Sequence, residues 1–182
     1  MQNTPQQKHQ TAEIRVFTNP ATPPAIASKP NHAAMLLAPF AGRDEIAKAV
    51  CSDIPLRSYE MDVLTPSINR LVTQLAADSG AKDIGPENLV YMTGRLIRIL
   101  IKDFKHLTPK EIKLAFENGL MGDYGEYYGV NLKTCIQFLT GYTKQRGQFI
   151  SKMMLQRDID RINREDQFFR ENKIKTQGIN KL

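Results

Sequence analysis

The chain has 182 residues, of which 41% are hydrophobic, and a formal net charge of +6 at pH 7. This length suits one domain with tails, and the longest apolar run, residues 33–41, is interrupted by Pro39 and too short to cross a membrane. The N-terminus lacks the apolar stretch of a secretory signal, and Cys51 and Cys135 match no metal or redox spacing. We therefore expect a soluble, cytoplasmic protein with reduced thiols.

The N-terminal quarter of the chain predicts a flexible arm. Residues 1–42 hold six of the ten prolines and are rich in Gln, Asn, Ala and Thr, a composition that buries too little apolar surface to fold alone. Residues 13–18 alternate as a short strand does, but the sequence offers no second strand to pair with it. We expect this segment to add to another protein's sheet or to stay disordered. Residues 35–40 could instead fold back on the core.

From residue 43 onward the apolar residues recur with helical spacing. A first short helix is predicted over residues 43–51. Thr65 and Pro66 predict the N-cap and first position of a second helix, which Gly80 would end. A third helix is predicted over residues 86–104. Its apolar residues wrap most of its circumference, so we expect it at the centre of a bundle.

Two more helices are predicted toward the C-terminus. Residues 108–111 have the pattern of a capping box with proline at the first helical position. Gly119 or Gly122 would end the helix that follows. The last helix is predicted to start near Asn131 and to extend to or beyond Phe169, with a broad apolar face on one side.

These elements predict an all-α protein: a small helical bundle with a disordered N-terminal arm and a long C-terminal helix. We expect three parts, namely the arm at residues 1–42, the bundle at 43–155, and an exposed charged helix with a tail at 156–182. The oligomeric state stays open at this point.

Positive charge is concentrated near the C-terminus. Residues 131–182 carry eleven basic and five acidic side chains, and no Asp or Glu occurs between Tyr127 and Arg157. A segregated surplus of this kind favours a polyanion or an acidic protein surface as partner. The alternative is a solvated helix face that only keeps the protein soluble. The residues predicted to form a nucleic-acid-binding outer face of the last helix are Lys133, Lys144, Arg146 and Lys152.

The sequence contains no pattern typical of a catalytic or cofactor site. The three histidines, His9, His32 and His106, are scattered, and no metal-ligand spacing occurs. Neither a GxSxG nucleophile elbow nor a GxxxxGK[ST] phosphate loop is found. We therefore predict a binding protein rather than an enzyme, without a metal or other cofactor.

Residues 119–129, GLMGDYGEYYG, form a connection that combines four glycines with three tyrosines. Glycine permits positive φ, and tyrosine supplies a flat apolar ring with a polar tip. One interpretation is that the tyrosines stack on bases beside the acid-free helix. The other is that they pack between helices, since Asp123 and Glu126 would repel phosphate. The residues concerned are Tyr124, Tyr127 and Tyr128, with Gly119, Gly122, Gly125, Gly129 and Asn131 shaping the connection.

A helix-turn-helix is an alternative interpretation of the middle of the chain. Residues 96–104, a short link and residues 108–118 have roughly its layout, although the link lacks the usual glycine. Lys110, Lys113 and Asn118 would then face outward from the second helix. This arrangement would make the protein a DNA-binding regulator.

Self-association is a further alternative. The charge-rich end of the last helix carries Ile159, Ile162 and Phe169, which could form a partial seam although the spacing is not a sustained heptad. The protein would then be a structural or scaffolding component.

Residues 107–142, LTPKEIKLAFENGLMGDYGEYYGVNLKTCIQFLTGY, carry a local resemblance to a known group of proteins. A helix of the EIxxAFxxG type leads into GxYGxYYGxN and then a helix ending in tyrosine, and the upstream IRVFTNP is similar as well. This pattern resembles small phage- and mobile-element-encoded replication accessory proteins of the helicase-loader-like kind. It covers about a fifth of the chain.

The resemblance implies a role in DNA replication that does not depend on an ATP site. It implies a helical module with an N-terminal arm that holds a replicative helicase and a basic surface for single-stranded or duplex DNA. For a phage-encoded protein, the compartment would be the bacterial host cytoplasm. The matching positions, which the resemblance implies shape the connection and its packing, are Glu111, Ala115, Phe116, Gly119, Gly122, Tyr124, Gly125, Tyr128, Gly129, Asn131 and Tyr142.

Overall fold

The computed structural model describes residues 31–80 and 85–179, with side chains as far as residue 172. Within these ranges the chain is all-helical, as predicted, with six α-helices, two 3-10 helices and no strand. None of the helices in this part of the chain is both long and apolar enough to cross a membrane. The elements in chain order are α1 (His32–Leu37), η1 (Ala38–Phe40), α2 (Glu45–Cys51), η2 (Leu56–Ser58), α3 (Met61–Asp78), α4 (Pro86–Asp103), α5 (Pro109–Leu120) and α6 (Leu132–Ile179).

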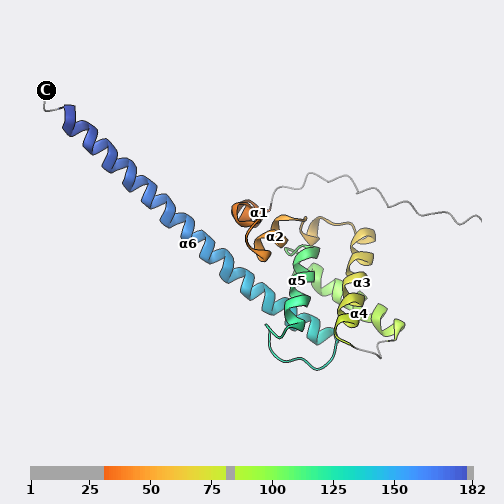
Figure 1. Cartoon of the computed structure of the whole chain (residues 1–182). Coiled ribbons are helices and arrows are strands. Elements are labelled where there is room, and N and C mark those ends of the chain that lie inside the picture. The colour runs from red at the N-terminus through yellow and green to blue at the C-terminus, as the bar shows by residue number, and fades with distance from the viewer. Residues whose placement is uncertain (1–30, 81–84, 180–182) are drawn as a thin grey trace, which may run out of the picture.

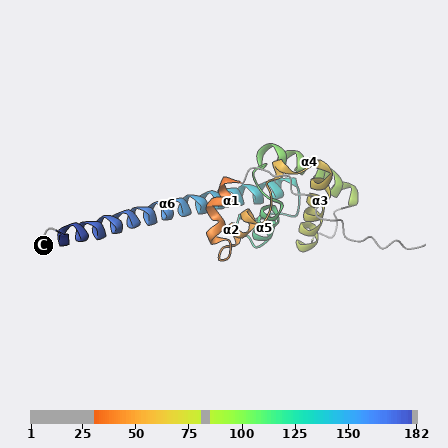
Figure 2. The same cartoon turned by 90° about the horizontal axis from the view of Figure 1, so that it is seen from above.

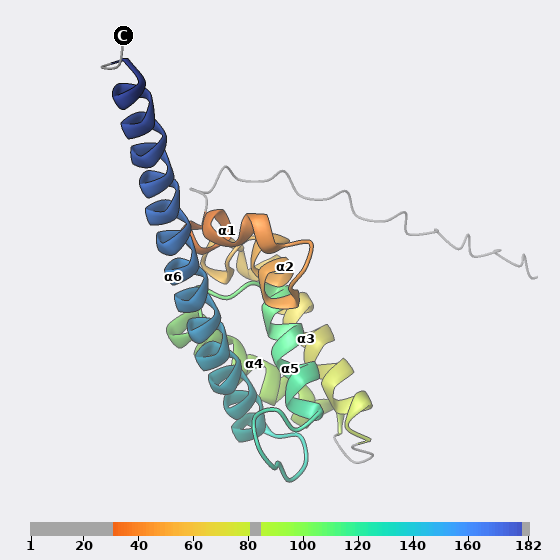
Figure 3. The same cartoon turned by 60° about the vertical axis from the view of Figure 1, so that its left-hand side comes forward.

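Helices α1 to α5 gather around the first part of α6, and the second part of α6 extends well beyond them (Figures 1 and 2). The predicted long C-terminal helix is therefore confirmed. Figure 3 shows α1 beside the middle of α6, and the two helices are in contact. The two cysteines of the chain are both free, and Cys135 is buried in the core.

The predicted boundary between arm and bundle at residue 42 is wrong for the last part of the arm. Asn31 caps α1 by accepting a hydrogen bond from the backbone N–H of Ala33. Leu37 is fully buried in a small cluster with residues of α2 and with Phe149 and Met153 of α6. Residues 31–42 thus fold back on the bundle, because this apolar segment finds a matching face on α6. The arm as far as residue 30, with the predicted strand at 13–18, lies outside the described residues.

Helix α3 begins one turn earlier than the sequence predicted. It starts at Met61, so Pro66 lies inside the helix rather than at its first position. Leu64 and Ile68 lie on one face and are both almost fully buried, and the burial of Leu64 offsets the hydrogen bond that a proline cannot donate. Gly80, with a φ of 69°, follows the end of the helix as predicted.

The central helix of the bundle is α5, and the prediction that residues 86–104 occupy the centre is wrong. Helix α5 contacts α2, α3 and α6. Helix α4 buries one face, whereas Val90 and Tyr91 are 66% and 67% exposed. Helix α5 keeps an outer face on which Lys110 and Lys113 are exposed as predicted, while Lys113 pairs with Glu117 and Asn118 is half-buried.

The helical glycines Gly119 and Gly147 have different surroundings. A Cβ on Gly119 would overlap the ring of Phe138, so this ring packs directly on the backbone of α5. Gly147 lies farther along α6 and has no atom within 4 Å of its corresponding position. The packing of α5 on α6 therefore requires glycine at position 119, whereas no neighbouring atom requires it at position 147.

We predict that Gly119→Ala destabilises the fold by about 1–3 kcal/mol, because the added methyl group must displace the Phe138 ring. Gly147→Ala is the matched control and should be neutral or stabilising by up to about 1 kcal/mol, since alanine favours a helix and meets no neighbour. Urea unfolding of both variants, followed by circular dichroism, measures the difference. Equal stability of the two variants would contradict the contact between α5 and α6.

Candidate nucleic-acid interface on α6

The start of α6 is fixed by side-chain hydrogen bonds from the preceding connection. Asn131 accepts a hydrogen bond from the backbone N–H of Thr134 at 3.0 Å, which is the N-cap geometry. The hydroxyl of Thr134 donates to the carbonyl of Gly129 at 2.8 Å. These two contacts join the helix to the glycine- and tyrosine-rich connection, and they confirm the predicted start of the last helix near Asn131.

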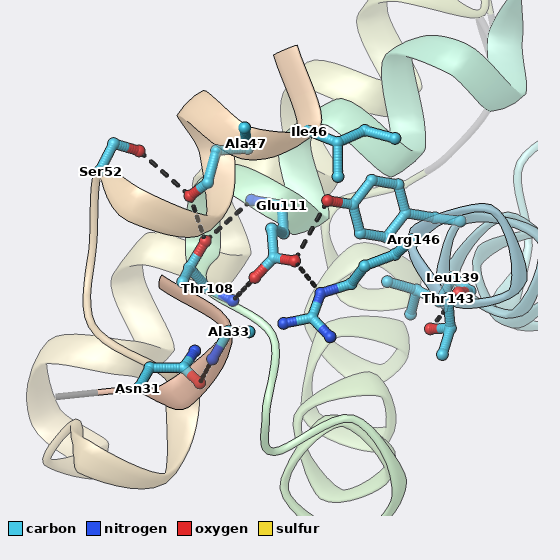
Figure 4. A network of polar contacts seen from close by, with 12 residues as sticks. Asn31, Ala33, Ile46, Ala47, Ser52, Thr108, Glu111, Leu139, Thr143 and Arg146 are labelled. Carbon is cyan, nitrogen blue, oxygen red and sulfur yellow. Dashed lines mark hydrogen bonds and ion pairs between the residues drawn. The ribbon is translucent and has the colours of Figure 1, made fainter. Parts of the chain in front are cut away.

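A buried carboxylate sets the orientation of α6 against the bundle. Glu111 is fully buried, and its Oε2 accepts a hydrogen bond from the backbone N–H of Thr108 at 2.9 Å. The Thr108 hydroxyl accepts from the N–H of Glu111 and donates to the carbonyl of Ala49 on α2. The predicted capping box is therefore confirmed, and it also connects α5 with α2 (Figure 4).

The other oxygen of the same carboxylate binds two side chains of α6. Oε1 of Glu111 accepts a hydrogen bond from the hydroxyl of Tyr142 at 3.1 Å and pairs with Nε of Arg146 at 2.5 Å. We call Thr108, Glu111, Tyr142 and Arg146 the Glu111 network. Burial, and after it the charge of Glu111, raises the pKa of the Tyr142 phenol, so this phenol stays protonated and remains a donor.

The prediction that Arg146 lies on an outer basic face is therefore wrong. Arg146 is 9% exposed and points into the bundle toward Glu111 (Figure 4). The helical period places it near the apolar face of α6, and the buried carboxylate on another helix provides its counter-ion. Its charge is used within the fold and does not contribute to a binding surface.

The three lysines of the predicted face have the opposite environment. Lys133, Lys144 and Lys152 are all exposed, and among the described residues none of them forms an ion pair. Asp123 and Lys144 line the same open hollow of about 650 Å³, but no ion pair joins them in this part of the chain. We call these three lysines the lysine face.

The helical period separates the lysine face from the buried side of α6. Lys133 and Lys144 are eleven residues apart, which places them within about 20° of each other around the helix axis, and Lys152 lies a further 80° or so around. Phe138, Leu139 and Tyr142 are fully buried and lie on the side of the axis opposite Lys133 and Lys144 by the same geometry. Lys133 and Lys144 therefore point away from the core, whereas Lys152 lies about 90° around the helix from the buried side.

Two of the three tyrosines in the connection pack against α6. The Tyr124 ring lies on Gly141, where an added Cβ would come within 2.5 Å of it, and the Tyr124 hydroxyl donates to Gln145 at 2.9 Å. The Tyr127 ring meets Phe138 edge to face, with ring centroids 5.2 Å apart. Both rings are partly buried, so the packing interpretation accounts for them.

Tyr128 differs from its neighbours, because its side chain is 87% exposed. It lies just before Gly129, whose φ of 69° requires the left-handed conformation that glycine adopts without strain. Gly122 and Gly125 also have positive φ, at 92° and 93°. The connection thus folds two tyrosine rings inward and leaves Tyr128, five residues before Lys133, in solvent.

A second exposed tyrosine was not among the predicted residues. Tyr91 on α4 is 67% exposed, and the guanidinium of Arg95 lies over its ring at 5.8 Å from the centroid. Both residues line an open groove of about 330 Å³ with the first residues of α6. The i, i+4 spacing of Tyr91 and Arg95 was visible in the sequence. The proximity of α4 to the start of α6 was not.

We predict that Glu111→Gln destabilises the fold by about 3–5 kcal/mol, because it leaves the guanidinium of Arg146 enclosed without a counter-ion. Glu117→Gln is the matched control. Glu117 pairs with Lys113 at the surface of the same helix, and loss of that pair should cost about 0.5 kcal/mol or less. Urea unfolding of both variants measures the difference, and similar stabilities would refute the proposed importance of the Glu111 network.

The chain was compared with protein-family models, with curated proteins and with solved structures, and none of them matches it. The resemblance in residues 107–142 therefore rests on its motif positions alone. Among these positions, Glu111 and Tyr142 belong to the Glu111 network, and Gly119 makes the close contact with Phe138. Their contacts are those of residues that shape the fold around the connection.

Proposed function

We propose that this chain is a non-enzymatic accessory protein of DNA replication that binds nucleic acid through the lysine face of α6. The observation that carries the proposal is the environment of Lys133, Lys144 and Lys152. They are exposed, they form no ion pair among the described residues, and they lie in a stretch without Asp or Glu. Lysines in this state can neutralise phosphates and release the condensed counterions of a nucleic acid.

Exposed aromatic rings support single-stranded nucleic acid as the preferred ligand. Tyr128 stands in solvent close to Lys133 in the chain, and Tyr91 carries a cation over its ring. Unpaired bases stack on such rings, whereas the bases of a duplex are already stacked on each other. A basic face with exposed tyrosines therefore suits a strand whose bases are accessible.

The replication context rests on the resemblance in residues 107–142 and extends the binding role. A helicase-loader-like protein without an ATP site acts by binding its partners. We propose that the lysine face binds the single strand and that the N-terminal arm, residues 1–30, binds a replicative helicase. A helix-turn-helix regulator stays the alternative, since Lys110 and Lys113 on the outer face of α5 are exposed, and sequence-specific binding to duplex DNA would favour it.

We predict that changing Lys133, Lys144 and Lys152 together to Glu weakens binding to a labelled oligothymidylate. The log–log dependence of affinity on salt should flatten by roughly two units, since each phosphate contact on a single strand contributes about 0.7. The control variant changes Lys48, Lys102 and Lys105 to Glu. These lysines are also exposed and lie elsewhere in the fold, and their replacement alters the net charge by the same amount. If the two triple variants bound equally well, the lysine face would not be the binding surface.

We predict that Tyr128→Ala weakens single-strand binding by about 1–3 kcal/mol through loss of base stacking. Tyr128→Phe should bind as the wild type does, because it keeps the ring. Met121 is 82% exposed in the same connection, so Met121→Ala controls for loss of an exposed apolar side chain. Fluorescence anisotropy on single-stranded and duplex DNA measures the effect, and an equal loss on both would argue against stacking.

A further inference from the structure

The distal half of α6 carries a row of exposed apolar side chains. Leu155, Ile159, Ile162 and Phe169 are 63%, 42%, 52% and 68% exposed. Met153, which packs against the cluster formed by α1 and α2, lies on the other side of the helix axis by the helical period. The row therefore points away from the bundle, and no contact with another helix covers it in the described part of the chain.

The spacing of this row is that of a coiled-coil seam. Positions 155, 159, 162, 166 and 169 are separated alternately by four and three residues, and four of the five are apolar. In heptad terms, Leu155, Ile162 and Phe169 occupy d positions, while Ile159 occupies an a position. With Leu155 included, the partial seam extends over two full heptads. This spacing is typical of a helix that pairs with another helix.

Pairing with another helix would stabilise this exposed part of α6. Residues 155–172 span about 27 Å at 1.5 Å per residue, and every side chain from residue 154 to 171 is exposed. Isolated helices of this length are marginal in water, because most helical stability in proteins comes from packing of an apolar face. Pairing of two such rows would cover on the order of 900 Å² of apolar surface. That lies below the size of a standard stable interface, so we expect a reversible dimer.

The charges beside the row are complementary to those of a second copy of this chain aligned in parallel. One flank carries Asp158 and Glu165, and the other carries Asn163 and Arg170. In a parallel pair, the g position of one helix faces the e position of the other five residues farther on, so Glu165 meets Arg170 of the second copy twice by symmetry. In an antiparallel pair, Asp158 would face Glu165 of the second copy, which is repulsive.

We propose that residues 155–172 of α6 pair with the same segment of a second copy as a parallel two-stranded coiled coil. Neither Glu165 nor Arg170 forms an ion pair among the described residues, so both are free for the contact between copies. Asp166 lies in the row at an a position, so in a parallel pair it faces Asp166 of the second copy. A charged a position fixes register and limits stability.

The oligomeric state of the full chain tests the proposal by sedimentation equilibrium over a range of micromolar concentrations. We expect a monomer–dimer equilibrium that Phe169→Ala weakens at least tenfold. Phe168→Ala is the matched control, because Phe168 is 62% exposed next to Phe169 but lies off the row. Both residues lie outside the core, so circular dichroism should show both variants folded. A wild-type monomer at all concentrations, or equal effects of the two variants, would overturn the proposal.

The orientation is tested by reversal of one charge. In the parallel pair, Glu165→Arg faces Arg170 of the second copy and should weaken the dimer roughly tenfold through two symmetric repulsions. The double variant Glu165→Arg, Arg170→Glu should restore it. In an antiparallel pair, Glu165→Arg would face Asp158 and tighten the dimer, so that outcome would refute the parallel arrangement. Asp166→Asn removes the repulsion in the seam and should tighten the parallel dimer several-fold.

Discussion

A single buried carboxylate determines how α6 sits on the rest of the protein. Glu111 has no solvent contact, so its charge must be satisfied by protein groups. One oxygen binds the N-cap of its own helix and the other binds Tyr142 and Arg146 of α6. Rotation of α6 about its axis would remove both donors from one oxygen. The Glu111 network thus fixes the rotation of α6 about its own axis.

The outward direction of Lys144 follows from that setting. Tyr142 and Lys144 are two residues apart, so the helical period separates them by about 200° around the axis. If Tyr142 is held against Glu111, Lys144 must face solvent. Arg146 and the lysines consequently have separate tasks although they are close in sequence: the planar guanidinium neutralises a buried carboxylate, and the lysine side chains remain hydrated at the surface.

The sequence predicted the features that depend on local chemistry. The capping box at Thr108, the opening of α4 at Pro86 and the end of α3 before Gly80 each depend on a few neighbouring residues, and all are present. The same holds for Asn131 at the start of α6. Because caps and turns involve backbone groups within about four residues, they can be read from the chain without knowledge of the packing.

Features that depend on partners from distant elements were not predicted. The sequence left open whether residues 35–40 fold back on the core, and the structure shows that they do so against Phe149 and Met153 of α6. The burial of Arg146 depends on a carboxylate 35 residues earlier in the chain, and Pro66 is accepted within α3 because Leu64 gains a place in the core. The sequence also did not distinguish buried from exposed tyrosines in the connection. Only the fold separates Tyr124 and Tyr127, which pack, from Tyr128, which does not.

The proposed nucleic-acid-binding surface and the proposed dimer interface both lie on α6. Lys144 and Leu155 are eleven residues apart, so the lysine face lies nearly in line with the apolar row farther along α6. In a parallel dimer, the lysine faces of the two copies would then face each other. They would lie just before the start of the coiled coil, between the two helical bundles. Their mutual repulsion opposes pairing, and a polyanion bound between them would relieve it. Dimerisation and nucleic-acid binding would therefore strengthen each other, since a coupling free energy acts equally in both directions.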